Sequence, residues 1–475
     1  MPIAPSYSPQ SAFLKLGEGF ADPVTAANFP KHILRFRNDR AAQSVGLDTL
    51  TDDEWITYFG RFHPLPDAME TPLAQRYHGH QFRSYNPDIG DGRGFLFAQL
   101  QDNHGRLMDL GTKGSGQTPY SRFGDGRLTL KGGVREILAT ELLEALGANT
   151  SKTFSIIETG EQLERNDEPS PTRSAVMVRL THGNIRIGTF QRHAYFSDQE
   201  RVHKLTQYCL ETYFAHSLSG KREDDAIAFL SLVAEKVAEN AAHLMAAGFV
   251  HGVLNTDNIN ITGEIFDFGP WRFLPEMDLG FTAAYFDHSG LYSFGRQADA
   301  MHWNIYQLGG ALTEIAPEEE LKKVLETFPK LYLTALRTAL LNRIGVKPKG
   351  DKEDDEALSL INHFMINNKV AYEQFFFDWY GGQAASSHLE QSASPLIALY
   401  QEDRNTDLVA CLRSYSPIKK GIRDTAYFLN GSPCTLLIDE VESLWSAIAD
   451  RDDWTPLYTK IDAIRTMGAA LAPLS

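Results

Sequence analysis

Residues 251–269 read HGVLNTDNINITGEIFDFG, and this stretch decides which fold we expect. It places an amide side chain, Asn258, shortly before a carboxylate, Asp267, which is followed by Phe268 and Gly269. Magnesium prefers oxygen ligands, and one carboxylate with one amide oxygen leaves room for phosphate and water. The stretch therefore predicts two neighbouring loops at which a hard cation meets a phosphate group.

The spacing within this stretch is typical of the catalytic and metal-binding loops of protein kinases. Kinases carry His-Arg-Asp, an asparagine five residues after that aspartate, and later Asp-Phe-Gly. Here His251 and Asn258 keep the spacing and Asp267 begins an intact Asp-Phe-Gly, but Val253 occupies the position of the catalytic aspartate. Valine accepts no proton. Asp257 is the nearest carboxylate that could replace it as a base or as a further metal ligand, although it could also simply cap a turn.

Upstream of this stretch, Lys113 lies at the end of a predicted strand and Glu136 lies within the helix that follows. A lysine that contacts phosphate needs its ammonium held in place, and a carboxylate on a packed helix does this through an ion pair. A strand lysine and a helix glutamate are otherwise usually solvated surface groups. Their order, ahead of a third strand, is that of the small lobe of protein kinases and favours the pair.

The tetrapeptide Gly-Asp-Gly-Arg occurs twice, at residues 90–93 and 124–127, on either side of Lys113. Glycine lets backbone N–H groups approach an anion closely, and arginine adds a planar, permanently charged donor. Asp-Gly is also an ordinary hairpin turn, so a single copy would be weak evidence. Two copies that flank strands, with a lysine between them, favour a phosphate site.

The pattern of apolar residues changes along the chain. From residue 77 to about residue 191, short apolar runs predict an antiparallel sheet, interrupted by one helix that Gly147 ends. The predicted strands span residues 95–100, 107–110, 153–157 and 175–180. Beyond Ser197 the pattern is mostly helical, with a long amphipathic helix that ends at Gly248. We expect an α+β, protein-kinase-like two-lobed fold, with a small β-rich N-terminal lobe and a large helical C-terminal lobe.

This reading divides the chain into four parts. They are an N-terminal extension packed on the core (1–76), a β-rich nucleotide-binding lobe (77–191), a helical catalytic lobe (192–380) and a C-terminal helical region (381–475).

Composition excludes several classes of protein. The 475 residues include 45 basic and 61 acidic side chains, which gives a formal net charge of −16. This acidic excess argues against sequence-independent binding to nucleic acid or to a membrane surface, because both need clustered Lys and Arg. Three scattered cysteines do not suit a disulfide framework, and we find neither a signal sequence nor an apolar run of about 18 residues. We expect a cytoplasmic protein.

Four segments carry a family resemblance: residues 77–94, 109–147, 175–191 and 251–271. Together they closely resemble the selenoprotein O family of kinase-fold proteins, long regarded as pseudokinases. The resemblance implies protein adenylylation, in which AMP passes from ATP to Ser, Thr or Tyr hydroxyls of other proteins or of the chain itself, with Mg²⁺ or Mn²⁺ as cofactor. It also implies that the nucleotide binds in reversed orientation relative to ordinary kinases, so that pyrophosphate leaves.

The same resemblance implies roles for individual residues. Asp257 resembles the family's proton acceptor, whereas Asn258 and Asp267 resemble its metal ligands. The residues that match nucleotide contacts, with Glu136 as the partner of Lys113, are Gly90, Gly92, Arg93, Lys113, Asp125, Gly126, Glu136, Arg179, Arg186 and Asp267. Judged from the residues alone, Arg179 and Arg186 would be two cations on or near a strand, with surface placement as the default.

Two features depart from the family pattern. Many relatives end with a selenocysteine or cysteine, a redox element, whereas the last cysteine here, Cys434, lies well upstream. The sequence therefore gives no support to a terminal thiol switch. In the block 77–82, His78 stands where the family has a small residue; His78 and His80 could suggest a metal site, but no third ligand is evident and structural roles are favoured.

These motifs leave four activities to distinguish. An adenylyltransferase leaves an AMP-sized adduct, and a uridylyltransferase using UTP and Mn²⁺ is a variant, because the phosphate apparatus does not choose the base. A kinase leaves a phosphate-sized adduct, and Val253 argues against it. A non-catalytic nucleotide-binding pseudokinase would bind without turnover, which the joint presence of the lysine, glutamate, asparagine and aspartate disfavours. The sequence identifies neither the target proteins nor the oligomeric state.

Overall fold

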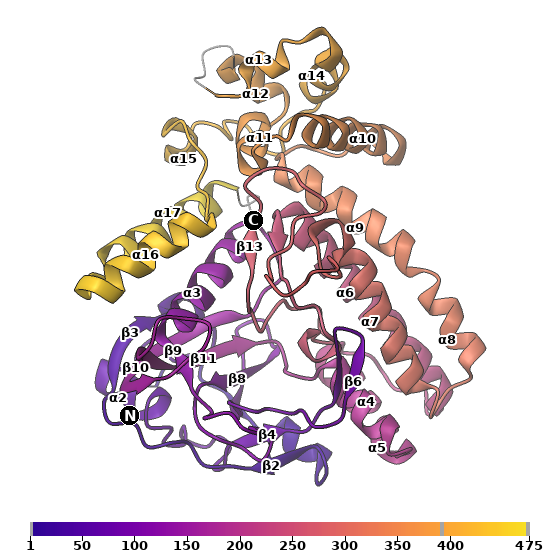
Figure 1. Ribbon diagram of the computed structural model, residues 1–475. Coiled ribbons are helices and arrows are strands. Elements are labelled where there is room, and N and C mark those ends of the chain that lie inside the picture. Colours follow the sequence, from indigo (N-terminus) through magenta and orange to yellow (C-terminus); the bar gives the residue numbers. More distant parts are fainter. Residues whose placement is uncertain (1–2, 390–393, 472–475) are drawn as a thin grey trace.

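The computed structural model describes residues 3–389 and 394–471 of the chain (Figure 1). A large sheet and its covering helices form a strand-rich part, coloured indigo to magenta in Figure 1, beside a larger group of helices. The protein is therefore a mixture of helices and a large antiparallel sheet, which confirms this level of the sequence prediction.

Within the described residues, nine strands form the main sheet, and its paired neighbours are antiparallel. Its spatial order is β2 (Ala21–Pro23), β4 (Leu73–Gln75), β7 (Leu96–Gln101), β8 (Leu107–Lys113), β11 (Thr172–Thr181), β10 (Lys152–Leu163) and β3 (Ile33–Arg37), with β1 (Pro9–Gln10) beside β7 and β9 (Leu128–Thr129) beside β11. Strands β7, β8, β10 and β11 are the four predicted ones. The pair β10–β11 extends beyond the predicted bounds because polar residues such as Gln162 and Arg173 continue the pairing past the apolar middle.

Residues before 77 supply strands and core side chains to this same sheet. Helix α2 (Asp52–Phe59) begins with a capping box formed by Thr51 and Glu54, which satisfies free N–H groups of its first turn. Trp55 of α2 is fully buried and donates a hydrogen bond to Ser155 Oγ of β10 at 2.9 Å. The division of the chain into four parts stays a prediction.

Both faces of the sheet are covered. Alternate residues of a strand point to opposite faces, and Ile156 and Met177 therefore join the core with α3 (Leu130–Ala145), whereas Ile157 and Val178 join the core with α2. Helix α3 begins at Thr129, whose side chain accepts from Gly132 N, and Gly147 follows its end in a left-handed conformation. Burial on both faces gives a rigid support for β8 and α3, which carry Lys113 and Glu136.

The long helix α6 (Arg222–Ala246) lies at the centre of the helical part and packs against α7 and α9 (Figure 1). Its Leu230, Val233 and Val237 are fully buried, as their spacing of three to four residues predicts. The other helices after the sheet are α4 (Ile187–Tyr195), α5 (Gln199–Tyr213), α7 (Gln297–Leu312), α8 (Glu318–Leu325), α9 (Phe328–Arg343), α10 (Asp351–Asn368), α11 (Tyr372–Trp379), α12 (Gln383–Leu389), α13 (Ile397–Tyr400), α14 (Thr406–Arg413) and α15 (Ala426–Leu429). None of the described helices has the length and apolar composition needed to cross a bilayer.

The last two helices return to the strand-rich part. Figure 1 shows α16 (Ile438–Arg451) and α17 (Thr455–Leu471), in yellow, beside α3 and away from α10–α14. Arg465 of α17 forms a bidentate ion pair with the buried Glu141 of α3 at 2.7 and 2.8 Å. The end of the chain therefore supports the helix that carries Glu136.

Candidate active site

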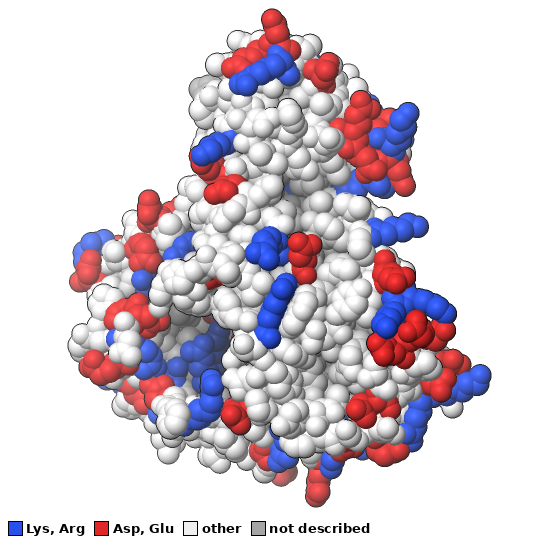
Figure 2. Space-filling model, turned by 45° about the vertical axis from the view of Figure 1, so that its right-hand side comes forward, with Lys and Arg blue, Asp and Glu red and all other residues white. Residues whose placement is uncertain are grey.

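An open cavity of about 790 Å³ is lined by loops from both halves of the chain. Figure 2 shows Lys and Arg side chains inside a hollow over the strand-rich part. The predicted site residues that line the cavity are Gly90, Gly92, Arg93, Lys113, Asp125, Gly126, Arg179, Arg186, Asp257, Asn258 and Asp267. Residues separated by more than 170 positions in sequence thus face one space. A locally basic cavity coexists with the acidic net charge of the whole chain.

Lys113 is held by Glu136, as the order of strand and helix predicts. Its Nζ lies 2.5 Å from Glu136 Oε1 and 3.8 Å from Asp267 Oδ1, and both members of the lysine–glutamate pair are buried. Breaking such a buried pair typically costs about 3–5 kcal/mol, because the remaining charge is left without a partner. The ammonium therefore has a fixed position at the wall of the cavity.

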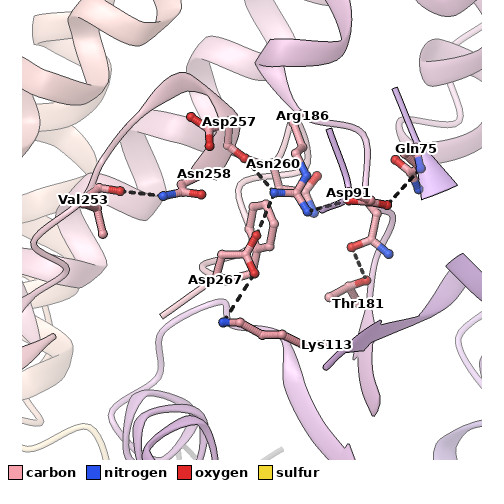
Figure 3. Close-up of polar contacts among 12 residues, drawn as sticks. Gln75, Asp91, Lys113, Thr181, Arg186, Val253, Asp257, Asn258, Asn260 and Asp267 are labelled. Atoms are coloured by element: carbon pink, nitrogen blue, oxygen red, sulfur yellow. Dashed lines mark hydrogen bonds and ion pairs between the residues drawn. The ribbon is translucent and has the colours of Figure 1, made fainter. Parts of the chain in front are cut away.

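Asp267 is the centre of the charged groups in the cavity (Figure 3). Arg179 Nη1 donates to its Oδ1 at 2.5 Å, and Arg186 Nη1 donates to its Oδ2 at 2.7 Å. Burial alone would raise the pKa of this carboxyl group, but the charges of Arg179, Arg186 and Lys113 outweigh burial and hold the pKa well below its usual value. Asp267 is therefore ionised, and its remaining lone pairs are available to a cation.

Both arginines are buried side chains, each only 4% exposed, and not the surface groups that arginines usually are. The Arg186 guanidinium lies over the rings of Tyr77 and Phe266, at 4.5 and 4.8 Å from their centroids, and such packing favours a desolvated cation. Nε of Arg179 and Nε of Arg186 are buried and have no hydrogen-bond partner among the described residues. Two buried guanidinium groups in the lining of one cavity suit an anionic ligand.

Asp91 is a site residue that the sequence analysis missed. Its Oδ1 lies 3.4 Å from Arg186 Nη2, and its Oδ2 accepts from the backbone N–H of Gln75 at 3.0 Å (Figure 3). It orients Arg186 from the side opposite Asp267. The repeated tetrapeptide was a sequence signal for Asp91. Asp125 holds the same position in the second copy, and it was among the predicted nucleotide contacts.

The first Gly-Asp-Gly-Arg lies under the loop that precedes the second. A Cβ on Gly90 would come within 2.5 Å of the Tyr120 ring, and one on Gly92 within 3.0 Å of the Tyr120 carbonyl oxygen. Thr118 Oγ1 and Ser121 Oγ donate to the carbonyl oxygens of Asp91 and Gly92, each at 2.5 Å. The two glycines are therefore needed for loop-on-loop packing.

The second copy forms the outer wall of the cavity. Asp125 is exposed and pairs with Arg165 at 2.9 Å, whereas Arg127 forms a bidentate pair with Glu161. Gly126 has a φ of +70°, and a Cβ there would lie 2.2 Å from the backbone carbon of Gly116. Arg93 of the first copy is also exposed and forms no ion pair with any described residue.

Asp257 and Asn258 lie side by side in the loop before Asp267. Burial is the main cause that raises the pKa of Asp257 to about 6, against the lowering effect of Arg186. Its Oδ1 is buried without a partner among the described residues, and its Oδ2 accepts from Gln81 Nε2 at 3.4 Å. Asn258 Nδ2 donates to Val253 O at 2.9 Å, which turns the amide oxygen the other way (Figure 3).

The donor set fits a cation that arrives with its phosphates. Asn258 and Asp267 offer one amide and one carboxylate oxygen, and no group of three His, Cys, Asp or Glu side chains suited to a metal occurs in the described part of the chain. A six-coordinate Mg²⁺ would take its remaining ligands from phosphate and water. His78 and His80 hydrogen-bond to protein groups, Tyr85 and Arg192 for His78 and Gln191 for His80.

The sequence model of the family described as "Protein adenylyltransferase SelO" matches residues 4–465. The "Protein nucleotidyltransferase YdiU" of Synechocystis sp. is 42% identical over 97% of this chain and 98% of its own length, and that of Trichormus variabilis is 40% identical over 98% and 97%. The protein of the same name from Azotobacter vinelandii is 35% identical over 82% of this chain and 78% of its own length.

These similarities define the class as protein nucleotidyltransferases. The chain belongs to the SelO family, which confirms the resemblance found from its motifs. The names of the relatives describe transferases and give no support to the label pseudokinase.

Proposed function

We propose that this chain transfers AMP from ATP to Ser, Thr or Tyr hydroxyls of proteins, its own included, in a reaction that requires Mg²⁺ or Mn²⁺ and releases pyrophosphate. The observation that carries the proposal is the grouping of Lys113, Arg179 and Arg186 around Asp267, in one cavity with Asp257. Three fixed cations suit a triphosphate, and a carboxylate at the wall of the same cavity suits an acceptor hydroxyl.

The reaction follows from these positions. The Asp257 carboxylate accepts the proton of the acceptor hydroxyl, whose oxygen forms a bond to the α-phosphorus as the bond from that phosphorus to the bridging oxygen of the β-phosphate breaks. Arg179, Arg186 and Lys113 balance the negative charge of the departing pyrophosphate. When bound, the cation would neutralise phosphate oxygens, with Asn258 and Asp267 as its protein ligands.

The same proposal includes the kinase-like arrangement of two lobes, with the cavity between the sheet and the helical part. The family membership and the buried Lys113–Glu136 pair support it. The proposal also includes a cytoplasmic location, supported by three cysteines that form no disulfide. Uridylyl transfer from UTP with Mn²⁺ is the second candidate, because the charged side chains proposed to bind the phosphates do not distinguish adenine from uracil.

Intact-mass analysis tests the proposal. The purified chain and a protein mixture are incubated with ATP or UTP, each with Mg²⁺ or with Mn²⁺, and the added mass identifies AMP, UMP or phosphate. We expect an AMP-sized adduct that disappears in Asp267→Ala and persists in Glu319→Ala, a matched change of an exposed carboxylate on α8. A phosphate-sized adduct, or no adduct under all four conditions, would overturn adenylyl transfer.

A further inference from the structure

The block around His78 and His80 folds into a tight hairpin. Strands β5 (Gly79–Gln81) and β6 (Ser84–Asn86) are joined by Phe82 and Arg83, whose φ values are +49° and +63°. Two-residue turns of this kind favour Gly or Asn, so larger residues carry a backbone strain that the surroundings must compensate. The hairpin is therefore held in place by strong contacts.

Those contacts are to the loop that carries Asp257. The backbone N–H of His80 donates to Thr256 Oγ1 at 2.7 Å, Thr256 Oγ1 donates to Gln191 Oε1 at 2.6 Å, and Gln191 Nε2 lies 2.7 Å from His80 Nδ1. The backbone N–H of Phe82 donates to Asn255 Oδ1 at 3.1 Å. Hairpin and loop thus form one hydrogen-bonded unit, although some 175 residues separate them in sequence.

Gln81 connects this unit to the carboxylate of Asp257. Its Nε2 is the one side-chain donor to that carboxylate in the described part of the chain, at 3.4 Å, and Asn86 Nδ2 donates to its Oε1 at 3.1 Å. The bond from Asn86 fixes which end of the Gln81 amide faces Asp257. Gly79 also lies against this carboxylate, because a Cβ on Gly79 would come within 3.0 Å of Asp257 Oδ1. The carboxylate is therefore confined between the hairpin and the cavity.

We propose that Gln81 is a positioning residue, which holds the Asp257 carboxylate in the orientation that receives the acceptor hydroxyl. This inference rests on the proposed function and deepens it. Among the described residues, the Gln81 side chain donates only to Asp257 and forms no hydrogen bond with Lys113, Arg179 or Arg186, the groups assigned to the phosphates. Its loss should therefore slow transfer and leave nucleotide affinity unchanged, because a freely rotating carboxylate meets the hydroxyl in the right orientation less often.

Two substitutions at this position separate orientation from packing. In Gln81→Ala the donor and the side-chain volume are lost, and we expect kcat for transfer to fall about 10-fold to 100-fold. In Gln81→Glu the shape and the acceptor for Asn86 remain, but an oxygen replaces the donor and a like charge faces Asp257, so kcat should fall further than in the alanine variant. A side chain that merely filled space would give the opposite order.

The measurements are kcat and KM for ATP, the Kd of a non-hydrolysable ATP analogue, and the thermal midpoint of each variant. Ser84→Ala, a change of an exposed residue on β6, is the matched control and should behave as the wild type. Asn86→Ala, which leaves Gln81 in place but unfixed, should lower kcat in the same direction by less, and it decides the question if Gln81→Ala does not fold.

The outcomes distinguish the two proposals. A wild-type chain that transfers nothing overturns the proposed function and this inference with it. If the wild type is active and Gln81→Glu has the same kcat, the role of Gln81 alone is overturned. The same conclusion follows if the loss in Gln81→Ala or Asn86→Ala lies entirely in ATP affinity.

Discussion

Two identical tetrapeptides occupy very different surroundings in this protein. In the copy at residues 90–93, Asp91 is largely enclosed and contacts Arg186 and the N–H of Gln75. In the copy at residues 124–127, Asp125 is exposed and contacts Arg165 of a neighbouring loop. The same four residues therefore orient a buried cation in one place and connect two surface loops in the other.

The difference shows that burial and partners, more than residue type, decide the strength of an ionic contact. An exposed pair is screened by water and contributes about 0–1 kcal/mol. A buried pair stabilises little by itself, but removal of one partner costs several times more. The two copies allow this contrast to be measured with the same substitution in one molecule.

The largest effect is expected for Asp91→Ala. Arg186 loses one of its two carboxylate partners and Gln75 N loses its acceptor, so the chain should be destabilised by about 3–5 kcal/mol. Nucleotide transfer should fall about 100-fold, because Arg186 is no longer held in one position. Denaturant unfolding and steady-state rates measure both. Wild-type rates in a folded Asp91→Ala protein would show that Asp267 alone orients the arginine.

A smaller but still large effect is expected for Gly126→Ala. The left-handed φ of +70° and the backbone of Gly116 at 2.2 Å leave no space for a methyl group. We expect a loss of about 2–4 kcal/mol in unfolding free energy. Gly124→Ala, in the same tetrapeptide, meets only a carbonyl oxygen at 3.1 Å and should change stability by less than about 1 kcal/mol. Equal losses in both variants would contradict this account.

The third test concerns a buried carboxylate whose side-chain hydrogen-bond donor is neutral. Asp109 of β8 accepts from Gln99 Nε2 at 2.7 Å, and burial raises its pKa to about 7. Since the unfolded value is about 3.9, the folded chain retains a proton that the unfolded chain has lost. This contribution to stability is complete below about pH 4 and is lost as pH rises through about 7. Asp109→Asn should therefore unfold at a higher temperature than the wild type at pH 8, with the difference shrinking towards pH 5.

The smallest effect is expected for Asp125→Ala. The pair with Arg165 is exposed, so stability should change by less than about 1 kcal/mol. Because Asp125 also lines the cavity, a rise in the KM for ATP would indicate a nucleotide contact, as the family resemblance implies. Thermal unfolding and nucleotide titration separate the two contributions. A loss of stability as large as that of Asp91→Ala would remove the contrast between the copies.

The sequence predicted those parts of the molecule that depend on short-range patterns. Apolar spacing gave the four central strands and the helices α3 and α6, because burial of one face sets that spacing. The motif spacing also placed Lys113, Asn258 and Asp267 at one cavity. The strands β1 to β4 were not predicted, and three of them have only two or three residues, which is too short for a clear alternation.

The residues that orient the site could not be predicted in the same way. Asp91 and Gln81 act through partners about 95 and 176 residues away in sequence, and no local spacing reports such contacts. The burial of Arg179 and Arg186 was hidden for the same reason. It depends on the Tyr77 and Phe266 rings, which come from two distant segments.

The order of the elements along the chain also means that α3 is synthesised long before α17, a helix that packs against it. Helix α17 is translated last among the described residues. Its Arg465 pairs with Glu141, which follows Glu136 on α3. A polypeptide still attached to the ribosome thus has all the side chains that line the cavity before α17 can support α3. We expect α3, and with it Glu136, to be held less firmly until α17 has docked.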